Sequence, residues 1–133
     1  MSTPAGKALI LIADDRPSSR ELLRTVLERA GYAVIEAEDG EVAVEKARSE
    51  HPDLILLDLQ MPKLDGYGVM KVLRADRQFA ALPVLALTAS AMTGDRERIL
   101  AAGFTDYLSK PASPDQLREA VARLLENPGD PGS

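Results

Sequence analysis

At 133 residues the chain is long enough for one domain with a buried core, and 45% hydrophobic and 28% charged residues are typical of a soluble globular protein. A net charge of −5 gives no basic surface for nucleic acid or an anionic membrane. The sequence has no cysteine, which excludes disulfides and thiolate metal sites and fits a cytoplasmic location. It also has no apolar run of the roughly 20 residues needed to span a bilayer, so we expect no membrane segment.

The first apolar run, residues 8–13, predicts a buried strand that ends at the acidic pair Asp14–Asp15. A helix follows, and we expect it to end at Gly31, with glycine in the left-handed cap and Tyr32 packed back on the helix. This helix is predicted to carry a single inward stripe made of Leu22, Leu23, Val26, Leu27 and Ala30. A short strand at 33–36 comes next.

The middle of the chain repeats this alternation. Asp39 is placed to cap a second helix, which stops before Pro52. The strand at 53–58 is almost wholly apolar until its last residue, Asp58. Asp65 then opens a third helix, whose predicted inward residues are Val69, Met70, Val72 and Leu73.

Two more strands are predicted in the last third of the chain. The strand at 83–88 ends at Thr88, and a helix after it closes at Gly103 in the same manner as the first helix. A shorter strand at 105–109 leads directly into Lys110.

The final helix has the clearest start. Ser113 is the predicted N-cap, Pro114 occupies the first helical position, and Gln116 completes a capping box. Its apolar stripe is Leu117, Ala120, Val121, Leu124 and Leu125.

Five strand–helix repeats predict an α/β fold with a parallel five-stranded sheet between two helical layers. The strands at 33–36 and 105–109 are shorter and more polar than the others, so we place them at the edges. This selects strand order 2-1-3-4-5, the flavodoxin-like (βα)5 three-layer sandwich, whose ligands bind at the carboxyl ends of the strands. We assign the domain to residues 7–126, with flexible segments at 1–6 and 127–133.

The polar residues at the strand ends are expected to meet at one edge of this sheet. The carboxylates of Asp14, Asp15 and Asp58 repel one another unless a cation lies between them, and oxygen-only ligation favours Mg²⁺ or Mn²⁺. Lys110 adds an ammonium group and Thr88 a hydroxyl for the oxygens of a phosphoryl group. Asp58, on the central strand, is placed to attack phosphorus and form an aspartyl phosphate.

Five segments of the sequence resemble the receiver domain of two-component response regulators: Ile12–Asp15, Leu56–Pro62, Leu64–Gly66, Ala86–Ala89 and Gly103–Pro111. The resemblance covers roughly residues 7–126. It implies that Asp58 accepts a phosphoryl group from a histidine kinase or a histidine phosphotransfer protein. It also implies that Asp15, Asp58 and the backbone carbonyl of Gln60 ligate Mg²⁺ directly, and that Asp14 acts through water.

The resemblance further assigns a switch. Lys110 pairs with the phosphoryl group, Thr88 moves towards it, and Tyr107 turns inward, which remodels the face made by the fourth helix, fifth strand and fifth helix. The Lys110–Pro111 bond is expected to be cis. Gln60 and Ser90 lie at positions that tune the lifetime of the phosphoryl group in this family.

Two other functions fit the sequence less well. An aspartate-nucleophile phosphohydrolase needs a second acid two residues after the nucleophile, where this chain has Gln60. A flavin- or nucleotide-binding protein needs a Gly-, Ser- or Thr-rich loop after the first strand, whereas Asp14–Asp15 repels an anion. The alternative for Tyr107 is a half-buried packing residue on an edge strand. Asp39 and Asp65 are interpreted as helix caps or turn residues rather than as part of the site.

The downstream target stays open. We expect a protein partner and no direct nucleic-acid contact, and the family resemblance allows a phosphorylation-dependent dimer. The chain is either a stand-alone receiver or a module excised from a hybrid histidine kinase or larger regulator. His51 and the charged series Asp95–Arg98 are predicted to be solvated surface residues.

Overall fold

A computed structural model describes residues 7–89 and 93–126 of the chain. Within them the strands form one parallel sheet in the order β2-β1-β3-β4-β5. The strands are β1 (Leu9–Ala13), β2 (Ala33–Ala37), β3 (Leu54–Asp58), β4 (Val84–Thr88) and β5 (Asp106–Ser109). The helices are α1 (Pro17–Arg29), α2 (Gly40–Glu50), α3 (Gly66–Arg74), the short 3₁₀ helix η1 (Arg77–Phe79), α4 (Thr93–Ala101) and α5 (Pro114–Glu126).

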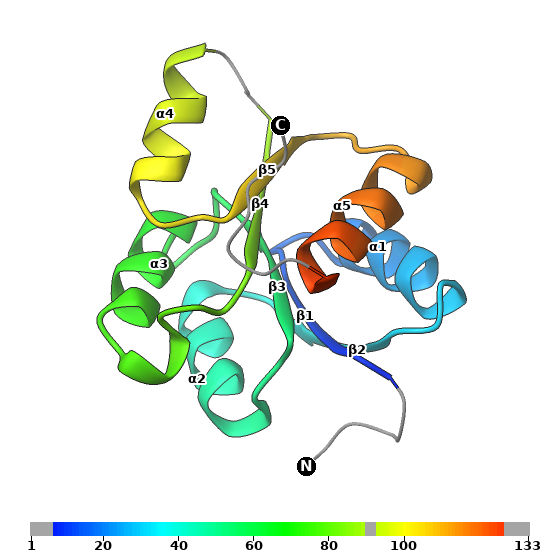
Figure 1. Ribbon diagram of the computed structural model, residues 1–133, viewed down its shortest axis with the longest axis horizontal. Helices are drawn as coiled ribbons and strands as arrows, with labels where there is room; N and C mark the ends of the chain where they lie inside the picture. The colour runs from blue at the N-terminus through cyan, green and yellow to red at the C-terminus, as the bar shows by residue number, and fades with distance from the viewer. Residues whose placement is uncertain (1–6, 90–92, 127–133) are drawn as a thin grey trace.

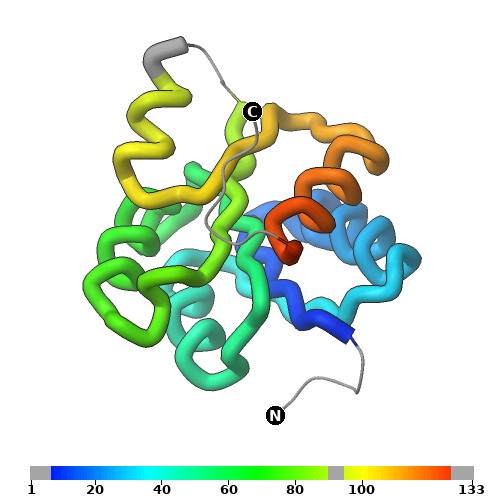
Figure 2. The backbone as a smooth tube through the Cα atoms, in the orientation of Figure 1, coloured from blue at the N-terminus to red at the C-terminus, as the bar shows by residue number. Residues whose placement is uncertain are grey.

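The flavodoxin-like three-layer fold and its strand order are therefore confirmed. Helices α1 and α5 cover one face of the sheet, and α2, α3 and α4 cover the other (Figure 1). The chain trace in Figure 2 shows α1 and α5 side by side, although they lie at opposite ends of the sequence. The expectations for segments 1–6 and 127–133 and for Ser90 concern residues that lie outside the described part of the chain.

The central strands contribute side chains to two separate cores, because successive side chains of a strand point to opposite faces of the sheet. Each fully buried aliphatic side chain contributes about 1.5–3 kcal/mol relative to an exposed one. The core under α1 and α5 contains Ile10, Ile12, Leu54, Leu56, Leu85 and Leu87 from the strands. The core under α2, α3 and α4 contains Leu11, Ala13, Ile55, Leu57, Val84 and Ala86.

The predicted glycine caps end α1 and α4. Gly31 and Gly103 have φ angles of 99° and 103°, in the left-handed region that glycine adopts without strain. The main-chain N–H of Tyr32 then donates to the carbonyl of Leu27 at 3.1 Å, and Phe104 donates back into α4 in the same manner. Both helices therefore close with the Schellman pattern of hydrogen bonds.

The predicted N-caps are also confirmed. The carboxylates of Asp39 and Asp65 each accept a hydrogen bond from the main-chain N–H three residues on, at 2.9 and 2.8 Å. Ser113 and Gln116 form the reciprocal capping box, with hydrogen bonds of 3.1 and 3.0 Å. These caps satisfy main-chain donors that the first turn of a helix otherwise leaves without partners.

The stripe predicted on α1 was too wide. Leu22 is 60% exposed and Ala30 is exposed, so the buried stripe is Leu23, Val26 and Leu27 alone. Adjacent helix positions differ by about 100° around the axis, and α1 contacts the sheet and α5 on one side only. Similarly, Val72 and Leu125 are only half-buried.

The longest helices among the described residues, α1 and α5, have 13 residues each. None of the described helices has the length and apolar character needed to cross a membrane.

Candidate functional site

A cleft opens at the carboxyl ends of the strands, where the sequence predicted a site. Five of the predicted residues line it: Asp15, Asp58, Gln60, Thr88 and Lys110. Asp14 is fully buried beside them. The lining is completed by Arg16, Leu59, Asp65, Tyr67, Ala89, Asp95 and Arg98.

Three carboxylates converge at this cleft. Oxygens of Asp14, Asp15 and Asp58 lie within 4.8 Å of one another; Asp14 and Asp58 are buried and Asp15 is exposed. Such a group is repulsive without a positive charge, and its hard oxygen donors match the ligands that Mg²⁺ binds in proteins. The donor set therefore fits a divalent cation, with the exposed Asp15 on the open side.

Lys110 provides a fixed positive charge in the cluster. Its Nζ donates to Asp58 Oδ2 at 2.7 Å and to Asp14 Oδ2 at 3.0 Å. Burial alone would lower the pKa of Lys110, but the hydrogen bonds and charges of Asp58 and Asp14 outweigh it and raise the pKa above its ordinary value. The ammonium group thus stays charged between two carboxylates.

Asp14 is held by several donors. Ser19 Oγ donates to its Oδ2 at 2.6 Å, and the main-chain N–H of Arg16 donates to its Oδ1 at 2.9 Å. Burial would raise the pKa of Asp14, but the hydrogen bonds from Ser19, Arg16 and Lys110 together lower it below its ordinary value. Asp14 is therefore a buried, permanently charged carboxylate at neutral pH.

Asp58 ends β3 and is positioned from both sides. Its Oδ1 accepts a hydrogen bond of 2.9 Å from the main-chain N–H of Gln60, while Oδ2 binds Lys110. Thr88 ends the neighbouring strand β4 and is buried at the wall of the same cleft. The main-chain N–H of Lys110 donates to the Thr88 carbonyl at 2.7 Å, which fixes the end of β5 beside β4.

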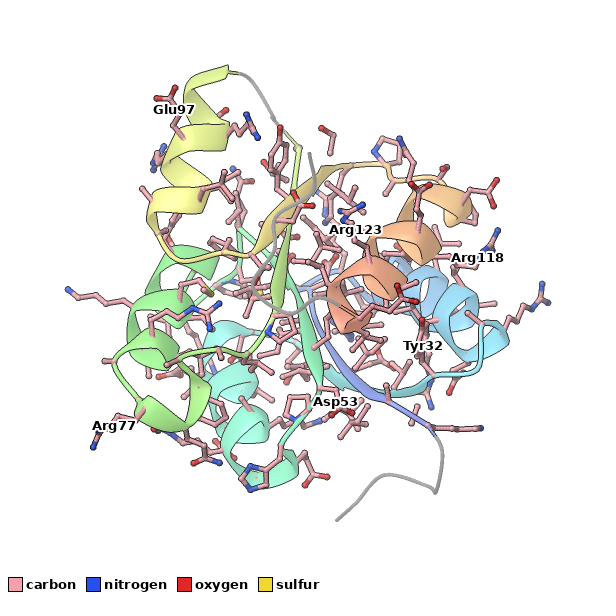
Figure 3. The ribbon with its side chains drawn as sticks, viewed as in Figure 1. Tyr32, Asp53, Arg77, Glu97, Arg118 and Arg123 are labelled. Atoms are coloured by element: carbon pink, nitrogen blue, oxygen red, sulfur yellow. The ribbon has the colours of Figure 1, made fainter. Side chains whose placement is uncertain are left out.

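Tyr107 lies outside the acidic cleft. It is half-buried on β5 and lines a separate groove with Arg96, Ser109 and Pro111. The Lys110–Pro111 peptide bond between the cleft and this groove is cis. At the far side of the groove, Arg123 reaches from α5 towards β5 (Figure 3) and binds Asp106 at 2.5 Å.

The sequence did not identify several residues around the cleft. The series Asp95–Arg98 was interpreted as a solvated helix face, and Glu97 does point away from the protein (Figure 3). Arg98, however, lies over the ring of Tyr67, 4.8 Å from its centroid, and both line the cleft. The sequence also did not indicate a role for Ser19, which reaches Asp14 from the first turn of α1. His51 is exposed, as expected.

Comparison with known proteins identifies the family. The sequence matches the response regulator receiver domain over residues 10–122, so the chain belongs to the receiver-domain family of response regulators. It is 40% identical over 116 residues to the polar-differentiation response regulator DivK of Brucella ovis, which covers 87% of this chain and 94% of DivK. It is 44% identical over 119 residues to the probable transcriptional regulator ycf27 of Porphyridium aerugineum, covering 90% of this chain.

The chain spans about half the length of the ycf27 relative, 48% of it. Among solved structures, the receiver domain of the sensor histidine kinase PA1611 from Pseudomonas aeruginosa is similar with a TM-score of 0.85 and 36% sequence identity. The match covers 92% of this chain and 100% of that one, and that structure has a magnesium ion coordinated in its active-site cleft.

The fold, the acidic cleft and the family together define what kind of protein this is. It is a receiver of two-component signalling that carries an aspartyl phosphorylation site. Receivers of this family are phosphorylation-controlled switches rather than turnover enzymes.

Proposed function

We propose that Asp58 is the phosphoacceptor of this receiver. The observation that carries the proposal is the bond from Lys110 Nζ to Asp58 Oδ2, at 2.7 Å, inside the cluster of three carboxylates. An Asp58 oxygen forms a bond to phosphorus while the P–N bond of a phosphohistidine breaks, and the bonding electron pair stays on the imidazole nitrogen. Lys110 then pairs with the new phosphoryl oxygens.

Asp15, Asp58 and the backbone carbonyl of Gln60 would hold Mg²⁺, with Mn²⁺ as a substitute. Bound there, the cation would neutralise negative charge on the phosphoryl oxygens. Asp14 takes part through water, because its two oxygens already accept three hydrogen bonds. The magnesium in the Pseudomonas relative supports this assignment.

Thr88 and Tyr107 are the proposed switch residues. Thr88 lines the cleft from the end of β4, so its hydroxyl can reach a phosphoryl group there. Movement of Thr88 would vacate space for Tyr107, which is now half-buried on the neighbouring strand β5 and packs against the core under α2, α3 and α4. The face made by α4, β5 and α5 would change shape and alter the affinity for a protein target or a second copy of the chain.

The histidine kinase passes its phosphoryl group directly or through a histidine phosphotransfer protein in this scheme. The receiver unit comprises residues 7–126. Its similarity to DivK over 94% of that protein favours signalling through protein contacts, whereas the ycf27 match fits a receiver that is one part of a longer regulator.

A small-molecule phosphodonor tests the assignment. Incubation with acetyl phosphate and Mg²⁺ is expected to add one phosphoryl group, detected by intact-protein mass, and Asp58→Asn is expected to abolish it. Asp53→Asn, a carboxylate at the opposite end of β3, is the matched control and should leave the incorporation unchanged. Equal incorporation in wild type and Asp58→Asn would overturn the proposal.

A further inference from the structure

Arg20 connects the acidic loop to the neighbouring edge strand. Its Nη1 donates to the main-chain carbonyl of Asp14 at 2.7 Å, and its Nε donates to Glu36 Oε1 at 3.0 Å. Its side chain is only 15% exposed. One guanidinium group on α1 therefore holds the end of β1 and the side chain of a β2 residue together.

The bond to Asp14 acts on the carbonyl and not on the carboxylate. That carbonyl belongs to the peptide unit that joins Asp14 to Asp15, and a peptide unit is planar, so fixing its oxygen fixes its orientation. Asp15 follows this peptide directly and is the exposed member of the acidic triad. The direction in which Asp15 leaves the main chain is therefore set by the contact with Arg20.

We propose that Arg20 is a positioning residue of the cation site, which holds the Asp14–Asp15 peptide so that the Asp15 carboxylate faces Asp58. The inference depends on the proposed function, because it assumes that Mg²⁺ binds at these carboxylates. Substitution of a residue that contacts and orients a direct ligand commonly lowers metal affinity by about 10–100-fold.

Glu36 in turn keeps Arg20 in place. Its second carboxylate oxygen accepts from Arg24 Nη1 at 2.8 Å, and its main-chain carbonyl accepts from Lys46 Nζ at 2.5 Å. Lys46 therefore anchors the main chain of Glu36, whereas the bond from Arg24, whose side chain is 47% exposed, is expected to add little. The planar guanidinium suits this arrangement, because its donors are fixed relative to each other and can bind two acceptors at once, whereas a lysine is a single point charge.

The sign of the expected effect separates positioning from simple electrostatics. Arg20 is a positive charge near a cation site, so removing it would by charge alone strengthen Mg²⁺ binding. Loss of a positioning contact would weaken it. A decrease in affinity on removal of a nearby cation therefore cannot arise from the charge change.

Isothermal calorimetry with Mg²⁺ alone tests the inference on wild type, Arg20→Gln and Arg24→Gln. Arg24 is a matched control, since it lies on the same helix and binds the same Glu36 but makes no contact with Asp14 among its described bonds. We expect Arg20→Gln to raise the Kd for Mg²⁺ about tenfold. Arg24→Gln should leave it within about twofold, as exposed ion pairs contribute little.

A double-mutant cycle supplies a readout that a merely structural role would not move. If Glu36 acts through Arg20, Glu36→Ala raises the Kd in the wild-type background and has no further effect in Arg20→Gln. Unchanged or tighter Mg²⁺ binding by Arg20→Gln, or additive effects in the cycle, would overturn the role of Arg20 and leave the proposed cation site standing. Failure of the wild-type chain to bind Mg²⁺ at all would overturn the proposed cation site with it.

Discussion

At Gly40, the structure and the local helix propensity make opposite predictions about how alanine would change the stability of the protein. It is the first residue of α2, where alanine has a higher intrinsic helix propensity than glycine, by up to about 1 kcal/mol. A Cβ at this position would lie 1.9 Å from the carbonyl oxygen of Leu64 and 2.7 Å from its carbonyl carbon. Leu64 belongs to the loop between β3 and α3 that borders the acidic cleft.

The overlap is with the main chain, so a side-chain rotation cannot relieve it. The loop would have to move by more than 1 Å to restore an ordinary contact. Overpacking costs typically about 1–3 kcal/mol, and a clash with the main chain belongs at the upper end of that range. After subtracting the propensity gain, we expect Gly40→Ala to lower the free energy of unfolding by about 2 kcal/mol.

Gly68→Ala is the matched control, because it makes the same substitution in a helix against the same neighbour. Its Cβ would meet the tip of the Leu64 side chain, 2.4 Å from Cδ1, and Leu64 is half-buried and can rotate. We expect a change within about 1 kcal/mol, since the propensity gain offsets the contact. The free energies of unfolding of the variants are compared by urea denaturation, with the m-value unchanged between them. A Gly40→Ala protein as stable as wild type, or as Gly68→Ala, would refute the reasoning.

Three further predictions concern the acidic cluster. Without metal, Asp15→Asn should raise the free energy of unfolding by about 0.5 kcal/mol, because it removes one of three repelling charges. Mg²⁺ at 100 times its Kd should stabilise the wild type by about 2.7 kcal/mol, and Asp15→Asn should abolish that stabilisation. If Mg²⁺ still stabilised the variant, the assignment of Asp15 as a ligand would be wrong. Ser19→Ala should cost about 1.5–3 kcal/mol in urea denaturation through the lost bond to Asp14, whereas the exposed Ser18→Ala should cost almost nothing. Because the folded pKa of Asp14 is lowered, its stabilisation is present above the unfolded pKa of about 3.9 and is lost as the pH falls through the folded pKa. Without metal, the stability of Asp14→Asn should therefore fall less steeply at acid pH than that of the wild type. The same loss of stability at acid pH in both proteins would contradict this.

The fold could be predicted from the sequence because each local pattern agreed with the others. Apolar runs without breaks mark strands covered on both faces, and Gly31 and Gly103 mark helix ends because few other residues adopt the left-handed cap. The more polar edge strands then determined the strand order. The same logic brought Asp14, Asp15, Asp58 and Lys110 to one edge, since parallel strands end on the same side.

The contacts that the sequence did not predict are those that depend on distances between elements. Whether a long side chain such as Arg20 reaches the carbonyl of Asp14, just after β1, depends on how α1 packs, which no local pattern encodes. The contact of Arg98 with Tyr67 likewise depends on the distance between α4 and α3. Leu22 was placed inside because periodicity gives the direction of a stripe but not its width.

Reductive mapping of the modified residue tests the central claim most directly. Hydride reduction of an aspartyl phosphate converts that residue to homoserine, so peptide mass spectrometry of the phosphorylated, reduced chain identifies the acceptor. The proposed function predicts homoserine at position 58 after treatment with acetyl phosphate and Mg²⁺, and none after treatment without a phosphodonor. Homoserine at Asp14 or Asp15, with Asp58 unmodified, would contradict it.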